Sequence, residues 1–211
     1  MEYQVSDIVT EVKVVLDRNN ASPSLDIGEE DALSIDEIIE SRVLTAAAYI
    51  ALMAPLSLID NSKPLTGIPV IAGGVGVLSL PSDFLRLHDF GMQSWQGRVT
   101  VIDDKDPLYA QQKSRYGGVR GNKQAPVVAV VNHGNQWELE LYSCESGDQV
   151  KHGSYIAIPA KTNGRIDLSQ RLKDTVVYHI AYLTCLSMGD TDTAARFLEP
   201  VRAVLNGEFR V

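Results

Sequence analysis

The chain has 211 residues, of which 45% are hydrophobic and 22% are charged; these values are typical of globular proteins and exclude disordered, fibrous and collagenous classes. Its 27 acidic residues outnumber its 19 basic ones, and the formal net charge of −8 argues against a general nucleic-acid-coating role, which needs clustered positive charge. No stretch approaches the roughly 20 apolar residues of a membrane-spanning helix, and the first residues lack a signal-peptide pattern, so we expect the protein to stay in the cytoplasm of the cell that makes it.

Two helices are predicted in the first quarter of the chain. Apolar residues recur at three- and four-residue spacing from Val5 to Leu16, which is the pattern of one buried helix face. Ser34 and Glu37 have the spacing of a capping box, so a second helix should begin there and bend or end before Pro55. Together the two segments predict a helical hairpin with two faces to bury.

Valine-rich runs separated by glycine and proline follow from about residue 69 and predict short β-strands. The expected strands cover residues 75–80, 84–90, 96–102, 126–131, 137–142 and 155–158. The sequence His133-Gly134-Asn135 lies between two of them and predicts a hairpin turn. Strands in chain order with short turns favour an antiparallel sheet, folded as a small sandwich or barrel.

A long polar loop, residues 103–124, separates the third and fourth expected strands. Loops of this length are uncommon inside compact domains and are usually functional or mobile. Its Tyr109, Arg115, Tyr116 and Arg120 could stack on nucleic-acid bases or contact phosphates. They could also form an arm across a neighbouring subunit, because Tyr and Arg are favoured at protein interfaces, or belong to an ordinary mobile loop. We favour the arm.

Helical spacing returns after residue 165, where Asp167 or Ser169 is a candidate cap for the first of two closing helices. The order of helices, sheet and helices predicts an α+β fold. The simplest arrangement packs the first helix pair against the last pair as a helical bundle, with the β region inserted as a second domain. The predicted domains are residues 1–66 with 165–211 for the bundle, and residues 67–164 for the inserted antiparallel β domain with its loop 103–124.

No set of residues predicts catalysis. The four histidines lack the spacing that places two imidazoles on one helix face, and Cys144 and Cys185 stand alone. The glycine run at 73–76 lacks the Lys-Ser/Thr pair of a phosphate loop and is followed by a strand, so it predicts a turn. We therefore expect no enzyme activity, no catalytic or metal-binding residue, and no cofactor.

Several short motifs, taken together, resemble the head–tail connector proteins of tailed bacteriophages, as in short-tailed and crAss-like phages. They are Leu80-Pro81-Ser82-Asp83-Phe84 at the start of a strand, Pro107-Leu108-Tyr109 before a glycine-rich loop, Pro126-Val127-Val128-Ala129 before a hairpin, and Val176-Val177-Tyr178-His179 with Met188-Gly189-Asp190 near the end. The similarity covers roughly residues 34–205, and none of these motifs is a catalytic signature.

The resemblance implies a structural virion protein that forms an adaptor ring, or neck, of twelve identical subunits beneath the portal. Such a ring would contact the portal protein and the downstream tail or ring proteins, and DNA would pass through its lumen without sequence-specific binding. The protein would be made in the host cytoplasm and end at the head–tail junction of the virion, with no membrane partner. The alternative is a cytoplasmic, non-enzymatic protein-binding module.

Interface residues do not follow from the family motifs, so we predict them from residue type and position. They are Tyr109, Arg115, Tyr116 and Arg120 in the loop and Glu208, Phe209, Arg210 and Val211 in the C-terminal tail.

Overall fold

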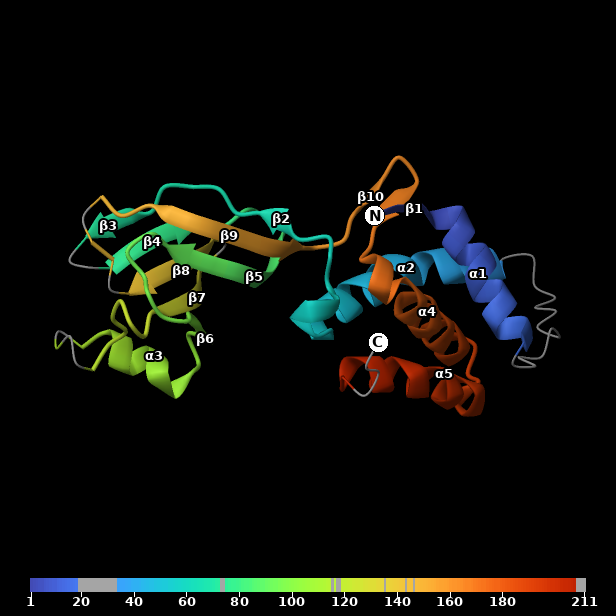
Figure 1. Ribbon diagram of the computed structural model, residues 1–211. Coiled ribbons are helices and arrows are strands. Elements are labelled where there is room, and N and C mark those ends of the chain that lie inside the picture. The colour runs from blue at the N-terminus through green and yellow to red at the C-terminus, as the bar shows by residue number, and fades with distance from the viewer. Residues whose placement is uncertain are drawn as a thin grey trace. The chain divides into compact units, whose positions relative to one another are not determined.

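The computed structural model describes residues 1–18, 34–72, 75–114, 116, 119–134, 136–142, 144–145 and 147–207. These residues form helices and strands in the order expected for an α+β protein, which confirms the predicted fold class. The chain divides into two compact units (Figure 1). The helical unit comprises Met1–Asn61 and Ile158–Val211, and the β unit comprises Ser62–Ala157.

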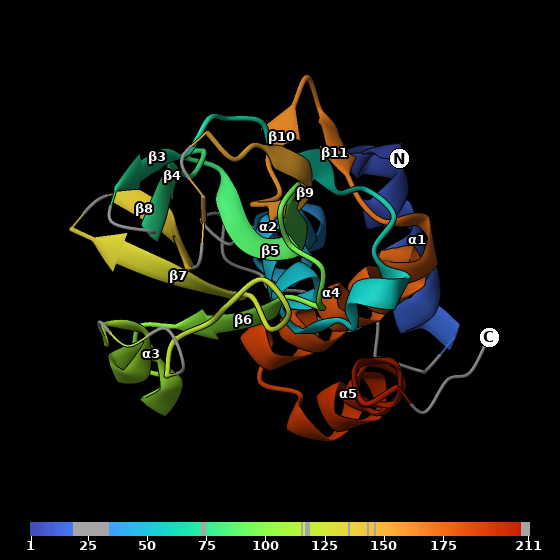
Figure 2. The same ribbon diagram turned by 60° about the vertical axis from the view of Figure 1, so that its left-hand side comes forward.

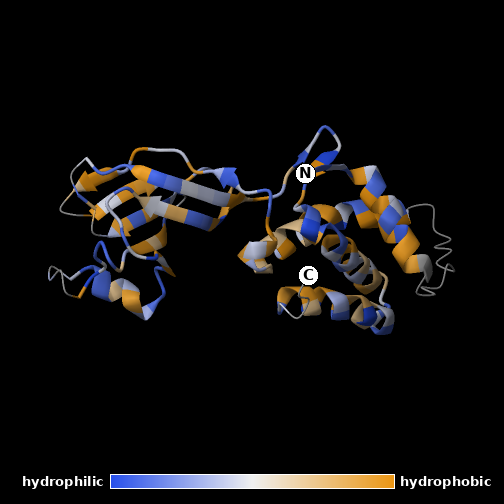
Figure 3. Cartoon of the chain, viewed as in Figure 1, coloured by the Kyte–Doolittle hydropathy of each residue, from blue (hydrophilic) through white to orange (hydrophobic). Residues whose placement is uncertain are grey.

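Helices make up most of the helical unit. They are α1 (Val5–Arg18), α2 (Ile35–Met53), α4 (Lys173–Ser187) and α5 (Thr191–Leu205), with single 3-10 turns at Leu56–Leu58 and Gln170–Leu172. Figure 3 shows hydrophobic and hydrophilic residues alternating along α1, as its helical spacing predicts. The capping box predicted for α2 is present: the Ser34 side chain accepts from the Glu37 amide, and the Glu37 carboxylate accepts from the Ser34 amide at 2.8 Å.

Helix α4 is the centre of the helical unit. It buries eight of its residues, including Val176, Ile180 and Cys185, and packs against α1, α2 and α5. Figure 1 shows α4 lying between α2 and α5. Because α5 packs mainly against α4, and not across the first helix pair, the predicted four-helix bundle is not confirmed. The helix begins at Lys173. Of its two predicted caps, Asp167 lies in a strand, and Ser169 is the N-cap residue of the 3-10 turn that leads into the helix.

A small three-stranded sheet completes the helical unit, in the order β1 (Glu2–Gln4), β11 (Arg165–Asp167) and β10 (Lys161–Thr162). Strands β10 and β11 form a hairpin in which Thr162 pairs with Arg165. The two residues between them, Asn163 and Gly164, have positive φ angles of 51° and 74°, as a type I′ turn requires. The sequence analysis missed this hairpin. Residues 158–164 therefore belong to the helical unit and not to the inserted domain predicted to end at 164.

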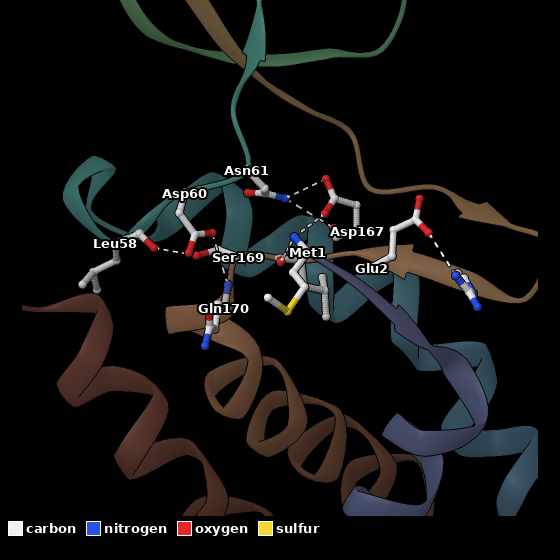
Figure 4. Close-up of polar contacts among 10 residues, drawn as sticks. Met1, Glu2, Leu58, Asp60, Asn61, Asp167, Ser169 and Gln170 are labelled. Atoms are coloured by element: carbon white, nitrogen blue, oxygen red, sulfur yellow. Dashed lines mark hydrogen bonds and ion pairs between the residues drawn. The ribbon is translucent and has the colours of Figure 1, made fainter.

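Hydrogen bonds join the two chain segments of the helical unit, residues 58–61 and 167–170, where they lie side by side (Figure 4). The Ser169 hydroxyl donates to the Leu58 carbonyl oxygen (2.6 Å), the Gln170 amide to Asp60 Oδ1 (3.2 Å), Asn61 Nδ2 to the Asp167 carbonyl oxygen (3.4 Å), and the Met1 amino group to Asp167 Oδ1 (2.7 Å). These contacts hold the segment from which the chain leaves this unit against the segment that joins β11 to α4.

The β unit contains two sheets. One has the order β2 (Lys63–Pro64), β9 (Val150–Ala157) and β5 (Phe84–Met92); the other has the order β3 (Val70–Ala72), β4 (Val75–Ser79), β8 (Gln136–Tyr142), β7 (Val127–His133) and β6 (Thr100–Asp103). Side chains of both sheets, among them Phe90, Leu139 and Tyr155, share one buried cluster. Two sheets facing a common core favour the predicted sandwich over a barrel.

The strand pairing corrects the prediction of an antiparallel sheet built in chain order. Strand β4 pairs with β8 and β5 pairs with β9, and β6 pairs with β7 in parallel, with Ile102 opposite Ala129. Parallel neighbours need a long crossover connection, which usually contains a helix. Here that connection is residues 104–126, and it contains helix α3 (Pro107–Gln112). The expected hairpin at Gly134 is confirmed, because β7 and β8 pair antiparallel on either side of it.

The motif Leu80-Pro81-Ser82-Asp83-Phe84 forms a corner between β4 and β5. Its Leu80 and Phe84 side chains are buried in the core cluster. The Asp83 carboxylate receives hydrogen bonds from Lys63 Nζ (2.7 Å) on β2 and from the Tyr155 hydroxyl (2.9 Å) on β9. The Lys63 hydrogen bond, the largest cause, lowers the pKa of Asp83. The motif thus holds the corner against the three-stranded sheet.

Candidate assembly surface

The crossover segment, residues 104–126, carries most of the residues that the sequence analysis assigned to an interface. Its helix α3 begins with two strong local signals. The Asp106 side chain accepts from the Leu108 amide at 2.8 Å, and Pro107 occupies the first turn, where its missing amide donor costs nothing. The predicted loop therefore contains a short helix, Pro107–Gln112, that the sequence analysis did not predict.

A buried glutamine ties α3 to the end of the segment. Gln112 is 4% exposed; its Oε1 accepts from the Gly121 amide at 2.7 Å, and its Nε2 donates to the Leu108 carbonyl oxygen at 3.2 Å. Both ends of its amide are satisfied, as a buried polar group requires. Nothing local in the sequence marks Gln112 as buried, so the sequence analysis missed it.

The C-terminal part of the segment is fixed to the loop between β5 and β6. The Lys123 carbonyl oxygen accepts from the amides of Gln96 (2.8 Å) and Gly97 (3.2 Å), and the Lys123 side chain forms an ion pair with Glu145. A Cβ atom at Gly97 would lie 1.6 Å from the Gln124 carbonyl oxygen. Only glycine permits this close approach of two backbones. The strand was predicted to begin at residue 96, but β6 begins at Thr100. The contacts of Gln96 and Gly97 with the crossover segment explain the difference.

Tyr109 points inward and anchors α3 to the sheet. It packs against a small buried cluster formed by Ile102, Ala129, Val131 and Tyr142. The Tyr142 hydroxyl donates to Glu140 Oε2 at 2.6 Å. Burial, with a smaller effect from hydrogen bonding to Glu140, raises the pKa of Tyr109 to about 12, and the same causes raise that of Tyr142 well above its usual range.

These two pKa shifts predict a loss of stability at alkaline pH. In the unfolded chain a tyrosine loses its proton near pH 10, whereas the folded β unit holds the proton of Tyr109 up to about pH 12. Above pH 10 the unfolded state therefore binds fewer protons, and the free energy of unfolding should fall as pH rises toward 12. Urea unfolding at a series of pH values measures this slope. The variant Tyr109→Phe/Tyr142→Phe should show a shallower slope; an unchanged slope would contradict the assignment.

The exposed side chains of the crossover segment include both apolar and basic ones. Leu108, Tyr116 and Val119 are 41%, 64% and 50% exposed. Lys105 and Lys113 are also exposed, and Arg120 is half-buried. We call these six residues the tip. Figure 2 shows α3 beside strand β6 at one edge of the five-stranded sheet.

The predicted interface residues fall into three groups. Tyr116 and Arg120 belong to the tip, whereas Tyr109 is half-buried beneath it with the Lys113 ammonium group 4.6 Å from its ring centre. Arg115 and the tail residues Glu208, Phe209, Arg210 and Val211 lie outside the described residues. The sequence analysis did not single out Leu108 and Val119 as interface residues, because only the fold of the segment shows that their side chains face solvent.

Charge is divided unequally between the two units. Residues 62–157 contain nine acidic and nine basic residues, so the helical unit, with 18 acidic and 10 basic residues, accounts for the whole net charge of −8. Within the β unit, residues 105–123 contain five basic residues and one acidic residue. The tip is thus a local basic feature of an acidic protein.

The described residues hold no group of three or more His, Cys, Asp or Glu side chains arranged to bind a metal ion. In the same part of the chain, none of the helices combines the length and the hydropathy of a membrane span. No known protein family matches the chain, and no curated protein sequence matches it either. The residues and their geometry therefore carry the functional proposal.

Proposed function

We propose that this chain is a structural protein of a tailed-bacteriophage virion and forms a head–tail connector ring beneath the portal. The observation that carries the proposal is the tip. Leu108, Tyr116 and Val119 are exposed together with basic side chains on a segment that a buried glutamine and several backbone hydrogen bonds hold in place. Exposed apolar groups on a preorganised support are typical of protein-binding surfaces, because little entropy is lost on binding.

The motif resemblance supports the same function. The Leu80-Pro81-Ser82-Asp83-Phe84 motif forms a corner, and its buried ends and the Asp83 hydrogen bonds give it a structural role. The Pro107-Leu108-Tyr109 motif starts α3 and supplies both an exposed residue, Leu108, and the anchor Tyr109. Of the motifs that resemble connector proteins, Pro107-Leu108-Tyr109 thus contributes to the tip and its anchor.

The charge distribution suits a lumen through which DNA passes. The helical unit carries the net charge of −8, and like charge weakens the sequence-independent attraction between proteins and DNA phosphates. In this proposal the lumen is lined mainly by the helical unit, and DNA passes without sequence-specific binding. The ring would contain twelve subunits, made in the host cytoplasm, and would contact the portal and the downstream tail or ring proteins.

Immunogold electron microscopy of phage particles tests the proposal. An antibody against this chain should label the head–tail junction of intact or partly disrupted particles, and native mass spectrometry of the purified protein should show a closed oligomer. A matched antibody against a cytoplasmic host protein is the control. Particles that stay unlabelled even when opened, with the protein left in the lysate, would contradict the proposal and favour a cytoplasmic, non-enzymatic protein-binding module.

A further inference from the structure

The tip has two properties that restrict what can bind it. An apolar surface would complement its apolar side chains, Leu108, Tyr116 and Val119. Acidic residues would complement its basic side chains, Lys105, Lys113 and Arg120. A partner must therefore offer an apolar patch with carboxylates beside it. The helical unit of this same chain is an acidic surface with 18 acidic and 10 basic residues.

A hollow of about 350 Å³ on the helical unit has these features. Its floor is apolar and is formed by Val5 of α1 and by Val43 and Leu44 of α2. The acidic residues Glu37 and Glu40 also line it, and we call this acidic side its rim. Leu44 is 40% exposed, so the floor is open to solvent.

The rim of the hollow keeps an excess of negative charge. Lys161 pairs with Glu40, and Lys13 pairs with Asp36 at 2.9 Å in the adjoining hollow. The Glu37 carboxylate accepts hydrogen bonds from Ser34, and its side chain forms none of the ion pairs found in the described part of the chain. The two adjoining hollows therefore contain three carboxylates, of Asp36, Glu37 and Glu40, and two ammonium groups, of Lys13 and Lys161. The excess negative charge would attract an approaching basic side chain.

We propose that the tip of one copy docks into the α1–α2 hollow of a second copy. The exposed apolar residues of the tip cover Leu44, and Lys113 and Arg120 approach Glu37 and Glu40. The contact joins two different patches of one protein, so it is heterologous and propagates from copy to copy; it makes a closed ring if the rotation between copies closes. The inference rests on the proposed ring and identifies the tip and the α1–α2 hollow as the two surfaces through which neighbouring subunits would bind.

Two variants each remove one side of this contact. In the tip variant, Lys113→Glu/Arg120→Glu reverses the charges that face the rim, and in the hollow variant, Leu44→Arg places a cation on the apolar floor. Each should weaken self-association on the order of 30-fold, the effect of losing an interface hot spot.

The matched controls are Arg98→Glu/Lys151→Glu, with the same charge change at exposed sites of the β unit, and Thr45→Arg, at the exposed neighbour of Leu44. Unchanged circular dichroism and urea unfolding would establish that each variant folds. If Leu44→Arg does not fold, Ser41→Arg, which also lies in the lining of the hollow, replaces it.

Mixing the two variants gives the decisive result. The hollow variant keeps a native tip and the tip variant keeps a native hollow, so a 1:1 mixture should form a pair with one native contact and grow no further. Native mass spectrometry should show rings for wild type and controls, monomers for each variant, and a heterodimer for the mixture. Rings from either folded variant, or a mixture that stays monomeric, would overturn the inference while leaving a wild-type ring and the proposed function intact. A wild-type protein that stays monomeric would overturn both.

Discussion

Replacing Gly97 with alanine should lower the free energy of unfolding of the β unit by about 3 kcal/mol or more. The new Cβ would lie 1.6 Å from the Gln124 carbonyl oxygen and 2.5 Å from its carbon, and both are backbone atoms that no rotamer change can move. The backbone must shift, and the hydrogen bonds that Gln96 and Gly97 donate to the Lys123 carbonyl oxygen should break. Urea denaturation measures the loss.

Hydrogen exchange adds a local measurement to the Gly97→Ala test. The amide of Gly121, which donates to buried Gln112 Oε1, should exchange faster in the variant, because the end of the crossover segment is released. The control is Gln96→Ala, at an exposed neighbour whose backbone amide keeps its hydrogen bond. If Gly97→Ala and Gln96→Ala were equally stable, the close backbone approach would not hold in solution.

Replacing Phe197 with alanine should cost about 3–5 kcal/mol in the helical unit. Phe197 is 1% exposed and is the largest fully buried side chain in the described residues, and its ring lies 6.5 Å from that of Tyr178 on α4. Helix α5 packs mainly against α4, so the cavity left by the ring would weaken the principal contact that holds α5. Typical domains are stable by only about 5–15 kcal/mol, so the loss is a large fraction of the total.

Two measurements separate loss of α5 from loss of the whole unit. Calorimetry gives the change in stability, and hydrogen exchange should show amides of α5 opening before those of α4. The matched control is Glu199→Ala, two residues away on the exposed side of α5, with an expected change within about 0.5 kcal/mol. A Phe197→Ala change below about 1 kcal/mol would show that α5 is not held by this contact.

Local patterns in the sequence were sufficient for the long elements. The spacing from Val5 to Leu16 and the Ser34–Glu37 capping box predicted α1 and α2, and both are found with their expected faces and cap. Most of the expected strands are also found, with shifted ends. In each case the signal lies within a few residues of the element that it predicts, so no distant contact is needed to read it.

Strand pairing could not be predicted because it depends on distant residues. Strand β6 has no local feature that distinguishes a parallel from an antiparallel neighbour, yet its pairing with β7 makes residues 104–126 a crossover. The short helix α3 has too few residues for a helical period to show. The β10–β11 hairpin, by contrast, has a local signal, because Asn163-Gly164 is a strong turn sequence. A hairpin could therefore have been predicted at this position.

The candidate site shows the same division. Interleaved tyrosines and basic residues pointed to one segment, but Tyr109 and Tyr116 could not be told apart by residue type. In the structure Tyr109 packs into a buried cluster and Tyr116 is exposed. Which tyrosine turns inward depends on Gln112 and on the sheet beneath α3, and both are contacts across the fold. The interface role of these residues stays a prediction.

The way in which the β unit interrupts the helical unit sets an order for folding during synthesis. Helices α1 and α2 are made before residues 62–157 and bury their apolar faces against α4, which is made after them. At roughly 20 residues per second the ribosome needs several seconds to make the intervening stretch. The β unit is continuous in sequence, so it can fold during that delay.

Folding of the β unit also prepares the closure of the helical unit. Its first and last strands, β2 and β9, pair directly, with Lys63 opposite Tyr155. Once this pair has formed, the long loop between α2 and α4 is already closed, and the entropy cost of bringing the two helices together falls. The helical unit is then completed last, so under the proposed docking a chain released early would carry a folded tip and an incomplete hollow.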